Sequence, residues 1–175
     1  MAKSSKEKII EDEKKILQEM KNHANKNISE ISKTLGFSRQ KIWRIIKRLE
    51  KNRTILGYNT VVDEEKLGLE TYFILIQRTV QPFDKELSEK IISREFEEQI
   101  HNLDCQIVSS TYTHGDFDWI LSITTDNIVK ATKVCELLKN RYKKYIKELL
   151  LIRSLFNAKI QGITNPNIEN LRDLI

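Results

Sequence analysis

Residues 28–51 read ISEISKTLGFSRQKIWRIIKRLEK, and this stretch decides how the first third of the chain folds. It predicts two short helices, one from the N-cap Ser29 to Leu35 and one that begins at a second N-cap, Ser38. Gly36 between them suits the left-handed position that ends a helix. Two helices that cross at such a turn form a compact device for placing the second helix in the major groove of DNA.

The helix that begins at Ser38 has one apolar and one basic face. Its apolar residues follow the spacing i, i+3, i+4 and i+7 and are expected to be buried; they are Ile42, Ile45, Ile46 and Leu49. From Ser38 to Arg53 the chain has seven basic residues and one acidic residue, Glu50. Because such a helix repels itself unless an anion is bound, we expect a polyanion partner.

Double-stranded DNA is that partner, and each side chain has an expected contact. Arg39 and Arg44 offer paired hydrogen bonds to guanine, and Gln40 offers them to adenine. Trp43 either packs on a sugar or a thymine methyl group or lies in a seam between helices, which we favour. Phosphate contacts are expected from Lys41, Lys47, Arg48 and Lys51. The whole predicted DNA-binding set is Ser38, Arg39, Gln40, Lys41, Trp43, Arg44, Lys47, Arg48, Lys51 and Arg53.

Composition and charge agree with this interpretation. The chain has 175 residues and a net charge of +5, but residues 1–60 carry 15 Lys and Arg against 7 Asp and Glu, a net +8. A lysine-rich solvated surface would explain the same asymmetry without DNA. No apolar run is long enough to span a membrane, and the polar N-terminus is not a secretory signal. Cys105 and Cys135 lack metal-ligand spacing, so we expect no metal and two buried thiols in a reducing cytoplasm.

Further elements flank this stretch. A first helix is expected over 6–21, and its apolar stripe is Ile9, Ile10, Ile16, Leu17 and Met20. Arg53 to Tyr58 is expected to form the short strand and turn of a wing. After Leu69 the pattern predicts strands over 71–79, 104–113, 117–124 and 146–156 and helices over 83–100 and 127–144. This βαββαβ order is ferredoxin-like. In the tail, Asn165-Pro166 predicts a turn and Asn167 a cap for a short helix.

The motifs from Ile16 to Tyr58 resemble the helix-turn-helix of the Lrp/AsnC, or feast/famine, regulators. They include Leu35-Gly-Phe-Ser38, Ile42-Trp-Arg44-Ile45, Arg48-Leu-Glu50 and Ile55-Leu-Gly-Tyr58. Val61–Gly68 resembles the family's connection to its second domain, and Gly115-Asp-Phe-Asp118 its glycine-centred hairpin. The resemblance covers about residues 9–158. The family usually has Gly where Arg53 stands, so we expect a different wing turn and an added phosphate contact.

The resemblance implies an α+β chain with an N-terminal winged helix-turn-helix followed by a ferredoxin-like βαββαβ domain. The expected parts are a DNA-binding domain 1–60, a hinge 61–68, a dimerisation and effector domain 69–158, and a C-terminal extension 159–175. The family forms homodimers, which often assemble to tetramers or octamers. It also binds amino-acid effectors near the hairpin, and no other cofactor is expected.

The residues carried over as effector-binding are Thr113, His114, Gly115, Asp116 and Asp118. A hairpin turn can offer N–H groups to a carboxylate, and an Asp can offer charge to an ammonium group. In the plainer interpretation, Gly115 supplies a positive φ and the Asp residues close the turn. The final strand reads Glu148-Leu-Leu-Leu-Ile-Arg153 where the family is often rich in Thr. The expected pocket is therefore bulkier and more apolar, or absent.

Two other function classes were weighed. Some relatives of the family use this architecture for tetrapyrrole decarboxylation, and His23, His101 and His114 are the candidate proton donors here. No nucleophile–base pair accompanies them and the second helix of the motif is strongly basic, so we expect no enzyme. Binding to RNA would need exposed aromatics, but Tyr72 and Phe73 are adjacent and face opposite sides. We therefore expect a sequence-specific, DNA-binding transcriptional regulator, with an architectural DNA-binding protein of low specificity as the alternative.

Overall fold

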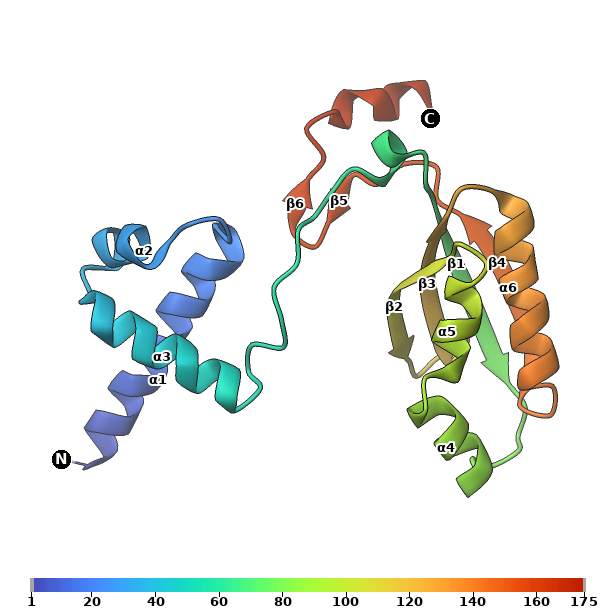
Figure 1. Ribbon diagram of the computed structural model, residues 1–175, viewed down its shortest axis with the longest axis horizontal. Coiled ribbons are helices and arrows are strands. Elements are labelled where there is room, and N and C mark those ends of the chain that lie inside the picture. The colour runs from blue at the N-terminus through green and yellow to red at the C-terminus, as the bar shows by residue number, and fades with distance from the viewer. Residues whose placement is uncertain (1, 175) are drawn as a thin grey trace. The chain divides into compact units, whose positions relative to one another are not determined.

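The computed structural model describes the backbone of residues 2–174 and the side chains of residues 6–174 (Figure 1). The chain divides into two compact units, Met1–Thr60 and Val61–Ile175. Each has its own hydrophobic core, and each is described by itself.

The N-terminal unit is built from three helices, α1 (Ala2–Asn22), α2 (Ile28–Leu35) and α3 (Arg39–Lys51). The apolar face predicted for α3 is buried, as expected. The buried core residues of the unit are Ile16, Ile31, Ile42, Ile45, Ile46 and Leu49. The stripe expected along α1 is only half correct, because Ile9 and Ile10 are 40% and 50% exposed.

The start of α2 differs from the prediction, and the turn after it agrees. The N-cap is Asn27, not Ser29: the Asn27 side chain accepts hydrogen bonds from the N–H groups of Ser29 and Glu30, and Glu30 Oε2 accepts one from the Asn27 N–H. This reciprocal capping box needs an acidic or amide side chain three residues after the cap, which Ser29 lacks. Gly36 is left-handed with φ 66°, as predicted.

The end of α3 shows how the chain leaves the helix. Ser38 caps the start of α3 as predicted, accepting from the Lys41 N–H at 3.2 Å. At the other end Arg53 takes the left-handed conformation, with φ 59°. Its N–H donates to the Glu50 carbonyl, and the Thr54 N–H donates to the Leu49 carbonyl. This pair of bonds is a Schellman motif, in which glycine usually occupies the position of Arg53.

The strand expected between Arg53 and Tyr58 is not formed. These residues run as a turn and an extended segment, although Ile55 still packs on the core. A strand needs a partner, and the described residues of this unit form none. The wing is therefore a coil in this chain. Arg53 keeps the glycine-like turn there, contrary to the expected change of shape.

The C-terminal unit is an antiparallel sheet with the strand order β2-β3-β1-β4, as the ferredoxin-like prediction requires. Its strands are β1 (Glu70–Arg78), β2 (Gln106–Tyr112), β3 (Trp119–Thr125) and β4 (Ile146–Arg153). Its helices are α4 (Lys85–Ile92), α5 (Glu95–His101) and α6 (Ile128–Arg141). The single helix expected over 83–100 is wrong. The left-handed Arg94, with φ 56°, breaks it in two, which lets both Leu87 and Phe96 reach the core.

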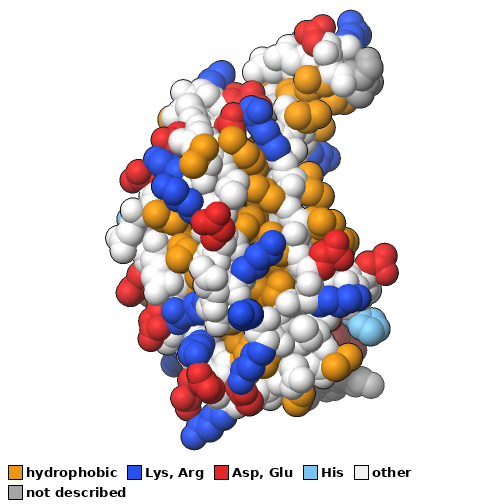
Figure 2. Space-filling model, turned by 90° about the vertical axis from the view of Figure 1, so that its right-hand side faces the viewer, with side chains coloured by type: hydrophobic (Ala, Val, Ile, Leu, Met, Phe, Trp, Pro, Cys, Tyr) orange, Lys and Arg blue, Asp and Glu red, His pale blue; other side chains and the backbone are white. Residues whose placement is uncertain are grey.

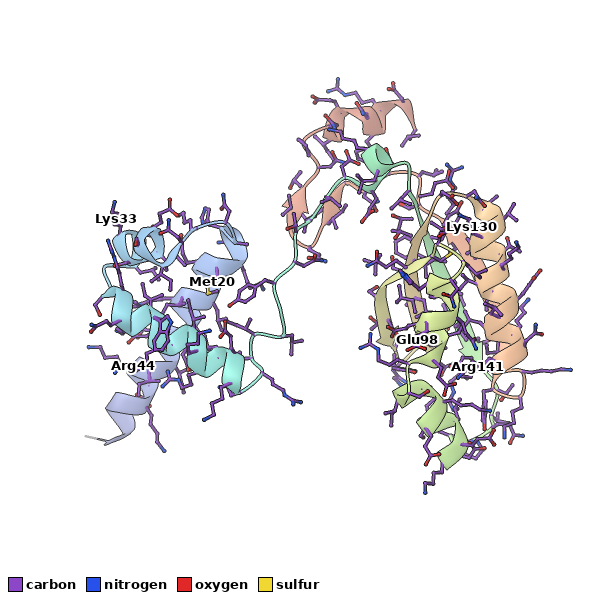
Figure 3. The ribbon with its side chains drawn as sticks, viewed as in Figure 1. Met20, Lys33, Arg44, Glu98, Lys130 and Arg141 are labelled. Atoms are coloured by element: carbon purple, nitrogen blue, oxygen red, sulfur yellow. The ribbon has the colours of Figure 1, made fainter. Side chains whose placement is uncertain are left out.

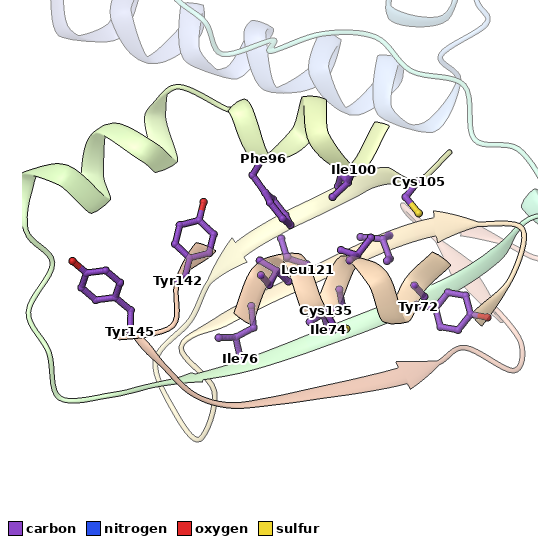
Figure 4. Close-up of a cluster of buried hydrophobic side chains, with 14 of the residues drawn as sticks. Tyr72, Ile74, Ile76, Phe96, Ile100, Cys105, Leu121, Cys135, Tyr142 and Tyr145 are labelled. Atoms are coloured by element: carbon purple, nitrogen blue, oxygen red, sulfur yellow. The ribbon is translucent and has the colours of Figure 1, made fainter. Parts of the chain in front are cut away.

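One face of the sheet carries the core (Figure 4). Tyr72, Ile74 and Ile76 of β1 alternate inward and are at most 1% exposed. They pack with Leu121 of β3 and with the helices that lie over this face, whose buried residues include Phe96, Ile100, Ala131, Val134 and Leu138. Tyr72 and Phe73 therefore face opposite sides, as predicted.

The other face of the sheet is apolar where β1 and β4 pair and carries Ser122 and Thr124 on β3, and no described element covers it. The register pairs Phe73 with Ile152 and Leu75 with Leu150, all four on the face away from the helices. Leu150 and Ile152 remain 40% and 45% exposed. On the side drawn in Figure 2, Lys and Arg are interspersed with Asp and Glu, and hydrophobic side chains reach the surface between them.

Within this unit, short elements precede and follow the four-stranded sheet. A 3-10 helix η1 (Glu64–Leu67) ends at the left-handed Gly68 before β1 begins. The tail forms a small hairpin of β5 (Lys159–Ile160) and β6 (Ile163–Thr164), then a 3-10 helix η2 (Ile168–Asp173). The side chain of Asn167 does not cap η2 as expected. Instead the Asn167 N–H donates to Asn165 Oδ1 at 2.9 Å.

Candidate nucleic-acid interface

The outward side of α3 carries the candidate interface. Arg44, labelled in Figure 3, is exposed on this helix, whereas its neighbours Ile42, Ile45 and Ile46 are buried. Within 4.0 Å, no carboxylate among residues 6–174 pairs with four basic side chains of this region, Arg39, Arg44, Lys51 and Arg53. Their charges are therefore available to an anionic partner.

The three other basic residues are already paired. Lys41 Nζ lies 2.7 Å from Asp12 Oδ2 and Arg48 Nη2 lies 2.7 Å from Glu13 Oε1, both on α1. Lys47 Nζ lies 2.8 Å from Glu50 Oε2 on α3 itself. These three ion pairs reduce the self-repulsion expected of α3, while four basic residues of the region stay unpaired within the described chain. The acidic run Glu11-Asp12-Glu13, one turn before the buried Ile16, is the sequence signal that was missed.

Lys41 makes contacts within the N-terminal unit rather than facing solvent alone. Its ammonium group lies 3.8 Å from the centroid of the Phe37 ring and pairs with Asp12, which is only 9% exposed. Removing one partner of such a half-buried pair leaves a poorly solvated charge behind. Lys41 thus fastens α3 to α1, and its contact with phosphate stays a prediction.

Glu50 links α3 to the extended segment that follows it. The Tyr58 hydroxyl donates to Glu50 Oε1 at 2.9 Å, while Lys47 occupies the other carboxylate oxygen. The hydrogen bonds from Lys47 and Tyr58 lower the pKa of Glu50, so its carboxylate is charged near neutral pH. Its ion pair with Lys47 also neutralises one cation of α3.

Trp43 does not lie in a seam between helices, so the favoured interpretation is wrong. Its side chain is 53% exposed on the outward side of α3. It helps to line an open surface hollow whose residues are Ile28, Ser38, Arg39, Gln40, Lys41, Trp43 and Arg44. Five of the predicted DNA-binding residues besides Trp43 are thereby brought together around one depression.

The hairpin predicted to bind an effector is held by its own hydrogen bonds. The Thr113 hydroxyl donates to the Phe117 carbonyl at 2.5 Å, and the Thr113 N–H donates to the Asp118 carbonyl at 2.9 Å. Asp118 Oδ2 accepts from the Arg78 N–H at 2.8 Å, where the register of β1 and β4 shifts. Gly115 has φ 152°. The Asp118 side chain therefore has a structural role, because it ties the hairpin to the end of β1.

The remaining predicted effector residues are more open. His114 and Asp116 are exposed at the tip of the hairpin, and neither side chain is hydrogen-bonded to another described residue. Leu149 and Leu151 of β4 pack on the core, whereas Leu150 faces outward. The apolar run in this strand thus fills the two faces of the sheet.

The histidines lie apart from one another in the described chain, and they form no metal-binding cluster with its acidic groups. His23 Nδ1 lies 3.2 Å from Glu19 Oε1 on α1, and His101 is at the C-terminal end of α5. Among the described residues, no group of three or more His, Cys, Asp and Glu could hold a metal ion. No helix in this part of the chain is both long and apolar enough to cross a membrane. Both cysteines are buried and free, as predicted.

Known proteins share this pattern. A family model described as winged helix-turn-helix DNA-binding matches residues 13–55, which cover α2, α3 and the C-terminal half of α1. The HTH-type transcriptional regulator PH1916 of Pyrococcus horikoshii is 30% identical over 123 residues, 70% of this chain and 77% of that protein. The regulator FL11 of Pyrococcus furiosus is 30% identical over 121 residues, 68% of this chain and 73% of that protein.

The similarity to solved structures extends over the second unit as well. An AsnC family transcriptional regulator from Agrobacterium tumefaciens has a TM-score of 0.63 at 18% identity, covering 89% of this chain and 95% of that one. The chain belongs to the Lrp/AsnC family of transcriptional regulators. The family's winged helix-turn-helix and α+β fold are both present. Another solved structure, the transcriptional regulator NMB0573 of Neisseria meningitidis in complex with L-Met, has a TM-score of 0.63 at 16% identity, covering 93% of this chain and 97% of that one.

Proposed function

We propose that this Lrp/AsnC regulator binds double-stranded DNA in the cytoplasm by placing α3 in the major groove. Arg39, Gln40 and Arg44 contact base edges, and Lys51 and Arg53 contact phosphates. The observation that carries this proposal is the concentration of unpaired guanidinium groups around one exposed hollow of α3. Lys41, Lys47 and Arg48 reach phosphate only by exchanging their carboxylate partners, so they contribute less.

The second unit, on this proposal, makes the chain a homodimer. The uncovered face of the sheet presents Phe73, Leu75, Leu150 and Ile152, an apolar surface that a second copy can bury. Two copies of α3 would then enter successive major grooves about 34 Å apart. Tetramers or octamers would follow from contacts between such dimers.

An amino acid is the effector class that the family neighbour with bound L-Met suggests. The hairpin 113–118 offers the exposed Asp116 to an ammonium group, and backbone N–H groups near Gly115 to a carboxylate. Asp118 supports this site indirectly, because its carboxylate holds the Arg78 N–H. Catalysis is not part of the proposal.

Substitution of Arg44 tests the DNA contact. Arg44→Ala should weaken binding to a selected site by about 1–3 kcal/mol and relax the base preference at one position. The measurement is a titration of the full chain with selected and random duplexes at fixed salt. Lys133→Ala, on the exposed surface of α6, removes the same charge and should leave both affinities unchanged.

Two results would contradict different parts of the proposed DNA binding. Unchanged base preference in Arg44→Ala would remove its contact while leaving DNA binding intact. A wild-type protein that binds a selected site no better than random DNA would instead favour the low-specificity architectural role. A specific regulator should prefer its site by at least about 10³.

Substitutions in the hairpin test the effector site. Asp116→Ala should abolish any shift in assembly or DNA binding caused by a pool of amino acids, while the dimer persists. Asp118→Asn keeps an oxygen acceptor for the Arg78 N–H and should preserve the fold of the turn. A shift that survives Asp116→Ala would place the effector elsewhere.

A further inference from the structure

Trp43 occupies an unusual place for a large apolar side chain. It is 53% exposed on α3, where it lies four residues after Arg39, three after Gln40 and four before Lys47. On a helix, residues at these spacings are surface neighbours. The indole therefore lies among the side chains proposed to enter the groove.

The chain itself gives this indole little to bind. The only other tryptophan, Trp119, donates from Nε1 to Ser110 Oγ at 2.9 Å and stacks on Tyr112 with ring centroids 5.6 Å apart. Among the described residues Trp43 has neither a hydrogen-bond acceptor nor an aromatic partner. An apolar body and one N–H donor are thus left facing solvent.

The major groove contains one base that offers both matching groups. Thymine presents the C5 methyl group beside its O4 acceptor, whereas cytosine presents an amino donor that would oppose the indole N–H. Guanine and adenine present acceptors but no methyl group. Apolar contact suits the flat indole, which loses little conformational entropy on binding.

We propose that Trp43 is a specificity-determining residue that contacts the C5 methyl group of one thymine in each half-site. The inference rests on the proposed binding of α3 in the major groove. It adds a requirement for a thymine methyl group, which the arginines and Gln40 do not supply, because their hydrogen bonds match the edges of guanine and adenine. Packing of Trp43 on a sugar would give no such requirement.

Deoxyuridine tests this contact, since it differs from deoxythymidine only by the missing methyl group. Each thymine of a selected duplex is replaced in turn, and the affinity of the full chain is measured. For the wild type, one replacement per half-site should weaken binding about fourfold, the factor expected for one buried methyl group. Trp43→Phe keeps an apolar ring and should retain most of this penalty, whereas Trp43→Ala should lose it.

Lys47→Ala is the matched control on the same face of α3. It should weaken binding to every duplex alike, so that the deoxyuridine penalty is unchanged. Because Trp43 is exposed, its variants should keep the wild-type circular dichroism spectrum, which is measured alongside.

Two results would overturn the proposal. One is a wild-type protein that prefers its selected site yet shows no penalty at any deoxyuridine. The other is a penalty that remains undiminished in Trp43→Ala. Loss of all preference for the selected site over random DNA, scored before any replacement, would remove the proposed function and this inference together.

Discussion

Arg53 shows how a single residue departs from what its position requires. Its backbone has φ 59° in the Schellman motif that ends α3, a conformation that costs a residue with a Cβ about 1–2 kcal/mol more than glycine. An arginine that costs stability at this position is expected to have a functional use. Its guanidinium group has no carboxylate partner among the described side chains, so the use we propose is a phosphate contact.

Arg53→Gly should therefore separate stability from DNA binding. We expect the free energy of unfolding of the N-terminal helices to rise by about 1 kcal/mol, because glycine adopts this φ freely. The affinity for random DNA should fall, since one charge is lost. Urea denaturation followed by circular dichroism and a DNA titration measure the two effects.

Arg53→Ala is the control for the charge. It should reduce DNA affinity as Arg53→Gly does but leave stability near that of the wild type, because alanine keeps the cost of the positive φ. Equal stability of the alanine and glycine variants would contradict the account of the turn.

The two cysteines give a second prediction at the residue scale. Burial raises the pKa of Cys135 to about 11 and also raises that of Cys105. The raised pKa keeps both thiols protonated at pH 8, where an unfolded chain would begin to ionise near its ordinary pKa of about 8.5. A thiol reagent at pH 8 should label neither cysteine in the folded chain and both in urea. Rapid labelling of Cys135 without denaturant would show that the site opens.

At the scale of the element, α3 balances attraction to DNA against its own stability. Glu50 is its only acidic residue, and it pairs with Lys47 and accepts from the Tyr58 hydroxyl. The Glu50 carboxylate therefore lowers the positive charge that α3 offers to DNA. It also holds Tyr58, in the extended segment that follows α3, against the helix.

Glu50→Gln should strengthen non-specific DNA binding. The amide can still accept from Tyr58, but it releases Lys47 and removes a negative charge that faces the phosphates. We expect roughly a threefold gain on random DNA at moderate salt and a steeper salt dependence, by about one counterion. Glu136→Gln, an exposed residue of α6, should change neither quantity. An unchanged salt slope in Glu50→Gln would mean that Lys47 does not reach DNA.

The elements differ in how far local pattern determines them. The buried face of α3 could be predicted because Ile42, Ile45 and Leu49 repeat at the helical period. The break at Arg94 could not, since arginine carries no signal for a positive φ and only the packing of Phe96 requires the break. The same applies to the candidate site. The pairing of Lys41 with Asp12 and the exposure of Trp43 depend on how α1 and α2 pack against α3. This packing cannot be predicted from the spacing of residues within one helix.

At the scale of the whole molecule, one surface is incomplete in a single chain. The sheet of the C-terminal unit buries Tyr72, Ile74 and Ile76 on one side and leaves an apolar face on the other. A stable interface usually buries about 800 Å² on each partner. The dimer proposed here would also fix the spacing of two DNA-binding units, so its loss should reduce affinity for a two-half-site operator.

Leu150→Lys places a charge in the apolar part of that face, on the edge strand β4 beside Leu75, and should prevent dimerisation, because an unpaired ammonium group would be desolvated there. Sedimentation analysis should show a monomer, with weakened binding to a full operator and little change for a single half-site. Ile92→Lys, on the exposed side of α4, introduces the same charge on the helical side of the unit and should leave the dimer intact. A Leu150→Lys protein that remains dimeric would show that the chain associates through another surface, and that the spacing of the two α3 helices is set elsewhere.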